Sequence, residues 1–152
     1  MSLVDVFREI APEIKRIMEK RRGILAVYLF GSVACGKEGP LSDIDIAILY
    51  DKGREYTPSI FKDELLIGYE IEKLLRGKDI RGHEVEVVNL NRSNLLLKYK
   101  VIKEGKRIYV RDKRGVVLFE ADVISKYCDF KPTLDFINRF YIDGKLRKVG
   151  IR

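Results

Sequence analysis

The chain has 152 residues, of which 46% are hydrophobic and 35% are charged, a composition typical of a globular domain. Its 30 Lys and Arg residues against 23 Asp and Glu residues give a net charge of +7. Such a charge is typical of a well-solvated surface, and it also favours anionic ligands such as nucleotides. No apolar run comes near the length of about 18 residues that a membrane span requires, and the N-terminal residues lack the layout of a secretory signal, so we expect a cytoplasmic protein without a membrane partner.

The N-terminal part predicts one helix followed by one buried strand. Apolar residues recur at helical spacing over residues 3–20. Ser2 and Asp5 have the spacing of a capping box at the helix start, and Gly23 ends the helix. Residues 24–30 are continuously apolar and predict a buried strand.

The central part predicts a loop, a second strand and a second helix. Residues 31–41 are rich in glycine and predict a loop, and residues 42–50 predict a strand. A polar connection leads to a helix over residues 60–76, which Ser59 caps and which ends before Gly77.

The C-terminal half predicts a third strand over residues 84–90, a short helix over 94–104 and a short edge strand over 107–110. Apolar residues at three- and four-residue spacing then predict a long helix over 115–143, kinked or restarted near Pro132. A basic tail follows at residues 145–152. Four apolar residues lie partly off the main stripe of this helix and form a second edge that suits packing on a partner: Leu118, Ile124, Phe136 and Phe140.

The two cysteines, Cys35 and Cys128, lie far apart and lack the spacing of a metal site. Cys35 lies in the glycine-rich loop, where we expect an exposed thiol. Cys128 lies in the apolar pattern of the long helix, where we expect a small core residue.

The most informative pattern joins Gly31-Ser32 to Asp43-Ile44-Asp45 across ten residues. On a strand, residues i and i+2 point to the same side, so Asp43 and Asp45 project together. Adjacent carboxylates repel each other unless cations neutralise them, and in-line displacement at phosphorus uses paired cations about 3.5–4 Å apart. A Gly-Ser turn after a strand supplies N–H and hydroxyl donors for phosphate oxygens. The pattern therefore predicts a phosphoryl- or nucleotidyl-transfer site rather than two solvent-facing aspartates.

This pattern resembles the signature of the DNA polymerase beta-like nucleotidyltransferase superfamily, and the chain's size and flanking sequence resemble its minimal nucleotidyltransferase (MNT) branch. Residues 84–92 and 97–109 also resemble that branch. The resemblance implies an α/β (α+β) fold in which a short mixed β-sheet is covered on one face by helices, within a single domain spanning residues 1–152. It also implies that Gly31 and Ser32 bind the nucleotide and that Asp43 and Asp45 bind two Mg²⁺ ions.

A third carboxylate completes such a site in the family, usually an aspartate on a neighbouring strand. Alignment with the family pattern selects Glu86 for this catalytic and metal-binding role, and Glu84, on the same face of the predicted strand, is the alternative. Glutamate is longer by one methylene group, about 1.5 Å, which could weaken the second metal or misplace the attacking hydroxyl.

Many MNT proteins are antitoxins paired with helical HEPN-type toxins. The resemblance therefore implies transfer of AMP from ATP to a tyrosine of a HEPN-type toxin. Nothing in the residues themselves selects adenine or tyrosine.

Two alternatives stay open from the sequence. The chain could be a largely non-catalytic antitoxin that neutralises its partner by contact, or it could transfer a nucleotide to a small molecule. Nucleic acid is not expected as a direct substrate because no separate binding module is predicted. A homo-oligomer is compatible with the sequence.

Overall fold

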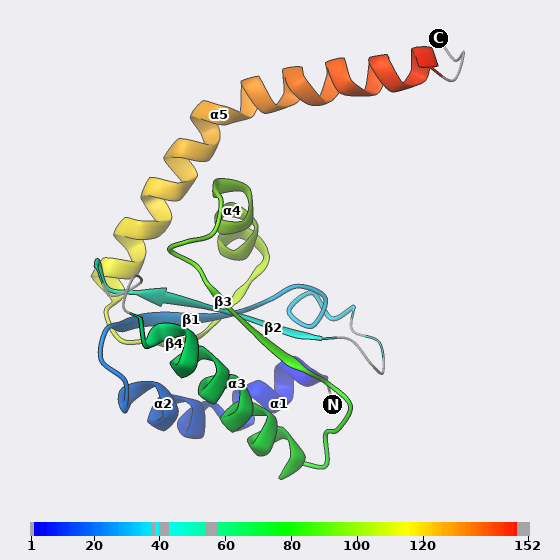
Figure 1. Cartoon of the computed structure of the whole chain (residues 1–152). Helices are drawn as coiled ribbons and strands as arrows, with labels where there is room; N and C mark the ends of the chain where they lie inside the picture. The colour runs from blue at the N-terminus through cyan, green and yellow to red at the C-terminus, as the bar shows by residue number, and fades with distance from the viewer. Residues whose placement is uncertain (1, 38, 40–42, 54–57, 149–152) are drawn as a thin grey trace.

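The computed structural model describes residues 2–37, 39, 43–53 and 58–148, and these form a four-stranded sheet with five helices (Figure 1). The elements in chain order are α1 (Leu3–Glu9), α2 (Ala11–Glu19), β1 (Ile24–Phe30), β2 (Ile44–Tyr50), α3 (Ile60–Arg76), β3 (Val85–Asn89), α4 (Leu95–Glu104), β4 (Lys106–Val110) and α5 (Lys113–Lys148).

The sheet is mixed, as predicted, with strand order β3-β2-β1-β4. β1 runs antiparallel to both β2 and β4, whereas β2 and β3 are parallel. The two central strands are the most continuously apolar segments of the chain, and nearly all of their residues are buried. This agrees with their position between two other strands and two layers of helices.

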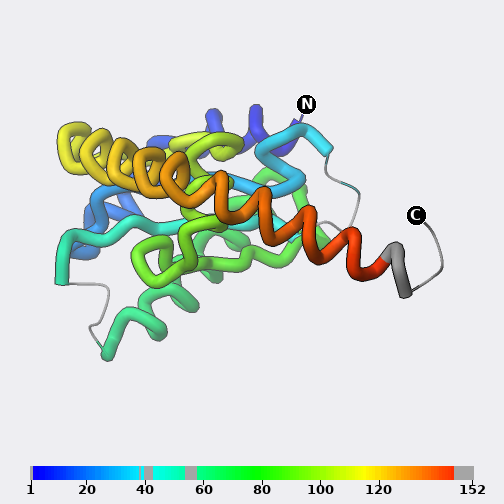
Figure 2. The backbone as a smooth tube through the Cα atoms, turned by 90° about the horizontal axis from the view of Figure 1, so that it is seen from above, coloured from blue at the N-terminus to red at the C-terminus, as the bar shows by residue number. Residues whose placement is uncertain are grey.

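Helices cover both faces of the sheet, whereas the sequence predicted one covered face (Figures 1 and 2). Alternate strand residues such as Val27 and Leu29 pack in one core with α1, α2 and α3. Their neighbours Ala26 and Tyr28 pack in a second core, which includes Val101 of α4 and residues of α5. The second core follows from the period-two alternation of side chains along β1.

The predicted N-terminal helix is two helices, because the chain breaks between them at Ile10. Pro12 lies in the first turn of α2, where its missing N–H costs nothing but where a continuous helix would clash with the carbonyl of the preceding turn. The predicted capping box is confirmed, since Ser2 and Asp5 satisfy each other's backbone N–H groups.

The other predicted elements agree with the structure to within about two residues at each end, the usual uncertainty of helix and strand boundaries. The second strand begins at Ile44 rather than at residue 42, which lies outside the described residues. Ser59 occupies the N-cap position of α3, but its side chain makes no capping hydrogen bond. Gly68 lies inside α3 against β3, where a methyl group would reach contact distance of the Val85 carbonyl.

α5 is one helix that continues through Pro132, so it is not restarted there. It extends beyond the predicted 115–143 at both ends and includes residues 145–148 of the predicted basic tail; residues 149–152 lie outside the described part of the chain. In Figure 1 its second half bends away from its first half, as an internal proline causes. Cys128 is exposed near this bend, so its predicted place in the core is wrong.

A buried carboxylate fastens the first half of α5 to the sheet. Glu120 is nearly inaccessible to solvent and accepts a 2.9 Å hydrogen bond from the Tyr28 hydroxyl of β1. Arg107 of β4 pairs with the same carboxylate, with its Nε at 3.1 Å from Oε1. A buried carboxylate that is both paired and hydrogen-bonded ties three elements together.

Candidate active site

The bend after β1 brings Gly31 against Asp45, which fixes one wall of the site. Phe30, the last residue of β1, lies opposite Asp45 of β2 in the antiparallel register. Gly31 follows with φ of 77°, a conformation that favours glycine. A Cβ built on Gly31 would overlap Asp45 Oδ2. Any side chain at position 31 would therefore displace the Asp45 carboxylate and would also have to adopt a positive φ.

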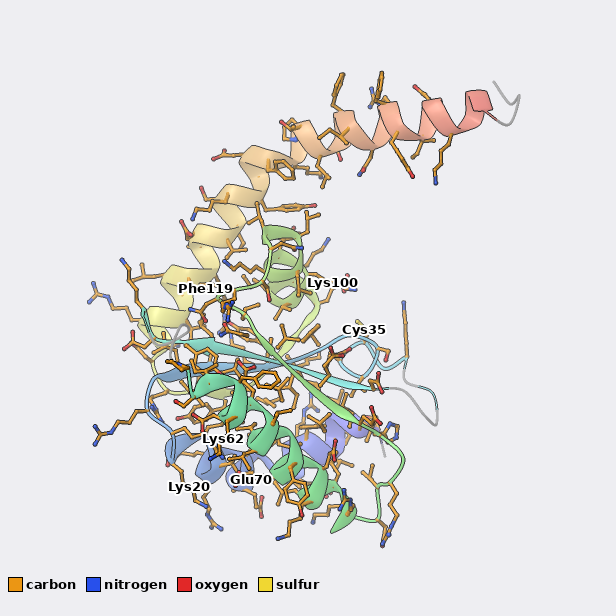
Figure 3. The ribbon with its side chains drawn as sticks, viewed as in Figure 1. Lys20, Cys35, Lys62, Glu70, Lys100 and Phe119 are labelled. Carbon is orange, nitrogen blue, oxygen red and sulfur yellow. The ribbon has the colours of Figure 1, made fainter. Side chains whose placement is uncertain are left out.

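The loop after this bend is wound into tight turns. The Cys35 N–H donates to the Gly31 carbonyl at 3.3 Å, and the Lys37 N–H donates to the Ser32 carbonyl at 2.8 Å. Val33 is buried between them and anchors the turn, whereas Ser32 is half-buried beside Gly31. Cys35 is exposed, as predicted, and points away from the sheet (Figure 3).

The three predicted carboxylates lie at the same end of the sheet. Asp45 and Glu86 are direct partners in the parallel register of β2 and β3, whose strands lie about 4.8 Å apart. Asp43 is exposed one residue before β2. The pKa of Asp45 is raised above its usual range, first because the side chain is partly buried and then because Glu86 and Asp43 carry like charges nearby.

Glu86 rather than Glu84 is the neighbour of Asp45. Glu84 precedes β3, and its carbonyl accepts the Ile44 N–H at 2.8 Å. The structure therefore gives the two glutamates different surroundings, although they share a face in the simple strand pattern.

Lys100 of α4 is a candidate site residue that the sequence did not indicate. Ala47 and Leu49 belong to the core beneath α4 and α5, so Asp45, which alternates with them, faces the same side of the sheet. Lys100 lies on α4 above that side (Figure 3), and its positive charge lowers the pKa of Asp45, against the effect of burial. No sequence pattern indicates Lys100, because α4 is far from the two aspartates in the chain and only the tertiary fold brings it near them.

The carboxylates at this end of the sheet are the kind of ligand that a divalent metal binds, although they lie too far apart to hold one ion as they stand. Carboxylate oxygens are the ligands that Mg²⁺ takes. Burial is the main cause of the raised pKa of Asp45, and the like charges of Glu86 and Asp43, which a bound cation would offset, add to it. Among the described residues, no three His, Cys, Asp or Glu side chains lie close enough to hold an ion as they stand. Binding would therefore need a change of side-chain rotamer at Asp43 or Glu86, both of which are exposed.

A family model described as polymerase beta nucleotidyltransferase matches residues 12–114, which include the bend and all three carboxylates. That match covers more than half of the 152 residues. The chain belongs to the polymerase beta nucleotidyltransferase family. The four strands lie within the matched region, whereas nearly all of α5 follows it.

Individual relatives agree with this assignment. A candidate protein adenylyltransferase of Methanocaldococcus jannaschii, MJ0435, is 28% identical over 105 residues, which cover 69% of this chain and 96% of the relative. A solved structure described as a candidate minimal nucleotidyltransferase matches with a TM-score of 0.53 and 25% identity, over 70% of this chain and 95% of its own.

Two crystal structures of toxin–antitoxin complexes share the fold over more of the chain. One contains AMP-PNP and matches with a TM-score of 0.66 and 22% identity, over 87% of this chain and 98% of its own. The other is a complex of a tri-AMPylated Shewanella oneidensis HEPN toxin with an MNT antitoxin, with a TM-score of 0.63 and 20% identity, over 90% and 98% of the two chains. Because they cover 87% and 90% of the chain, both alignments must extend beyond residue 114, where the family match ends, and therefore include part of α5.

In the described part of the chain, no helix is both long enough and apolar enough to cross a membrane.

Proposed function

We propose that this nucleotidyltransferase transfers AMP from ATP to a tyrosine hydroxyl of a HEPN-type toxin and acts as its antitoxin. The observation that carries the proposal is the contact between the Gly31 bend and Asp45, with Glu86 in register beside it. The relatives support the choice of AMP and of a HEPN toxin as the acceptor protein, because one bears the name of a protein adenylyltransferase and another is bound to an AMPylated HEPN toxin. The choice of tyrosine comes from the family resemblance.

The bend would hold the triphosphate. Gly31 lets the backbone approach the phosphates without a Cβ in the way, and Ser32 offers its hydroxyl and N–H to phosphate oxygens. Lys100 would offset the negative charge that accumulates where phosphates meet carboxylates. Asp43, Asp45 and Glu86 would hold Mg²⁺, which when bound stabilises negative charge on phosphate oxygens.

At phosphorus, the transfer step forms one P–O bond and breaks another, and one proton changes oxygen. The acceptor oxygen attacks the α-phosphorus, the bond to the leaving pyrophosphate breaks in line, and the hydroxyl proton passes to a carboxylate. Glu86 is the carboxylate proposed to orient the hydroxyl and accept its proton, because it is exposed on an edge strand where an acceptor can approach. The products are an AMP-tyrosine phosphodiester and pyrophosphate.

A labelling experiment tests this proposal. The protein is incubated with ATP labelled at the α-phosphate, Mg²⁺ and a candidate HEPN-type toxin from the same genome, and label is followed on both chains. We expect label on the HEPN protein with the wild type and none with Asp43→Ala/Asp45→Ala. Neutralisation of the toxin by the double variant without any label would instead support an antitoxin that acts by contact.

A further inference from the structure

The second half of α5 leaves the body of the protein and exposes a wide apolar face. We define the arm as residues 130–145; each described residue from Asp135 to Lys145 is exposed. Figure 1 places the arm above α4, beyond the face of the sheet that carries Asp45, and both views show it running toward the side of the molecule where the loop after β1 lies (Figures 1 and 2). The arm therefore extends over the catalytic end of the sheet without packing on it.

The apolar residues of the arm gather on one side. At about 100° per residue, six of them occupy roughly 160° of the helix circumference. We call them the arm stripe: Phe130, Leu134, Phe136, Ile137, Phe140 and Tyr141. Phe136 is 69% exposed and Phe140 is 73% exposed. Such large aromatic side chains are seldom left in water without a use.

The charged residues of the arm lie on the other side. Lys131, Asp135, Arg139 and Asp143 follow one another at four-residue spacing and alternate in sign. With Lys145 included, the arm carries three basic and two acidic residues, so its net charge is close to zero. Helices that lie on anionic membranes carry a clear basic excess on their polar face. Residues 130–145 have no such excess, but Arg147 and Lys148 follow in the same helix, so the vesicle measurement below is needed to test a membrane as the occupant.

The arm stripe continues a face that is already buried. Val116 and Val123 in the first half of α5 are buried against the body, and Tyr127 stacks on Tyr99 of α4 with ring centroids 3.6 Å apart. By helical period, Leu134 and Tyr141 lie on this same side of the helix. A second protein seated on the stripe would therefore contact the arm on the side that faces α4 and the sheet.

The width of the stripe indicates what kind of partner fits. Phe130, Leu134, Ile137 and Tyr141 follow the 4-3-4 spacing of a helix that packs along one other helix. Phe136 and Phe140 add a second row, which a single partner helix would leave uncovered. A groove between two helices covers both rows at once. The stripe thus fits a helical bundle better than an extended peptide.

From this arrangement we infer that the arm stripe is the docking surface for the helical protein that accepts the nucleotide, and that docking there holds the acceptor hydroxyl over the carboxylates. The inference rests on the proposed function for the identity of the partner. It adds a surface that lies outside the family's catalytic region, since the matched region ends at residue 114. A second copy of this chain and a membrane surface are the competing occupants.

The test uses the whole 152-residue chain and a candidate HEPN-type toxin from the same genome. Phe136→Ala/Phe140→Ala removes two exposed aromatic side chains and places good helix formers in the arm. Ile142→Ala is the matched control, because Ile142 is 55% exposed on the same arm but lies among its charged residues. Binding is measured by isothermal titration calorimetry, and circular dichroism checks that each variant keeps its helix content.

We expect the double variant to bind the HEPN protein at least about 30-fold more weakly than the wild type, because buried aromatic residues dominate protein interfaces. Ile142→Ala should bind within about twofold of the wild type. The double variant should keep its affinity for a fluorescent ATP analogue, because the arm is not part of the nucleotide site. Equal binding by wild type and double variant would overturn the inference, as would absence of binding by the wild type.

Two further measurements exclude the competing occupants. Sedimentation of the chain alone should show a monomer; a dimer that Phe136→Ala/Phe140→Ala dissociates would assign the stripe to a second copy. Flotation with vesicles of phosphatidylcholine and phosphatidylglycerol should show no binding that depends on these two residues. If the HEPN protein binds through the stripe but never acquires label, the docking inference stands and the proposed transfer fails.

Discussion

Asp45 occupies the space that a side chain at residue 31 would need. Gly31 directly follows β1 and Asp45 lies in the neighbouring strand β2. The closeness of Asp45 Oδ2 to the Gly31 backbone makes glycine at position 31 a requirement of the site as well as of the turn.

Gly31→Ala should therefore abolish transfer. The methyl group would displace the Asp45 carboxylate and strain a residue with positive φ, so we expect at least a 100-fold loss of activity. Gly36→Ala is the matched control, because Gly36 also has positive φ, in the same loop, but a Cβ there meets nothing within 4 Å. The control should lose about 1 kcal/mol of stability and keep its activity. Equal losses of activity in both variants would attribute the requirement to the loop backbone alone.

Glu86→Gln should lower the transfer rate by about 100-fold or more, because the amide can neither accept the proton nor neutralise a cation as a carboxylate does. Glu84→Gln, two residues away and outside β3, should change the rate less than about threefold. The rates are measured as labelled partner formed per minute at saturating ATP. A large loss in Glu84→Gln with a normal rate in Glu86→Gln would reverse the assignment of the third carboxylate.

Lys100→Ala should weaken the use of ATP, because it removes the positive charge that acts on Asp45 from α4. We expect kcat/KM for ATP to fall by about tenfold, mainly through KM if Lys100 contacts phosphate. Lys103→Ala removes an equal charge from an exposed residue of the same helix, and it should be close to wild type. Unchanged kinetics in Lys100→Ala would remove this residue from the site.

Glu120→Ala should cost about 2–4 kcal/mol of stability, because it leaves the buried Tyr28 hydroxyl without its acceptor and Arg107 without its partner. Asp122→Ala breaks only an exposed pair with Lys126 and should cost at most about 0.5 kcal/mol. Urea denaturation followed by circular dichroism measures both. A cost for Glu120→Ala no larger than for Asp122→Ala would show that the network does not hold α5 to the sheet.

Glu64→Gln should remove a part of the pH dependence of stability. The pKa of Glu64 is raised in the folded protein, first by burial, and this outweighs its hydrogen bond from Tyr50. The folded state therefore binds the proton more strongly than the unfolded state, so the contribution of Glu64 to stability falls as the pH rises from the unfolded pKa through the folded one. Melting temperatures from pH 4 upward should decline less steeply in the variant; identical slopes would contradict this.

The sequence predicted the elements whose local signals agree. β1 and α3 have the predicted bounds, since a continuous apolar run and a helical period are each bounded by turn-forming or capping residues. The carboxylate pair was predicted for a related reason: aspartates disfavour strands, so two of them at the start of a predicted strand indicate a function.

The incorrect predictions have two causes: contacts between residues far apart in the sequence, and one proline whose effect was overlooked. Pro12 divides the N-terminal helix although the apolar period continues across it. The second face of the sheet is covered because α4 and α5 pack on it. Their position is set by tertiary contacts, such as the hydrogen bond from Tyr28 to Glu120, which the sequence does not reveal. Cys128 lies in an apolar period but on a part of α5 where the body no longer covers the helix. Lys100 meets Asp45 only through the fold.

The central claim is that Asp43, Asp45 and Glu86 bind divalent ions beside the Gly31 bend. Titration with Mn²⁺ followed by electron paramagnetic resonance, in the presence of AMP-PNP, tests it most directly. The account predicts two protein-bound ions per chain in the wild type and loss of both in Asp43→Asn/Asp45→Asn. Equal Mn²⁺ binding by the two proteins, or none by the wild type, would contradict it.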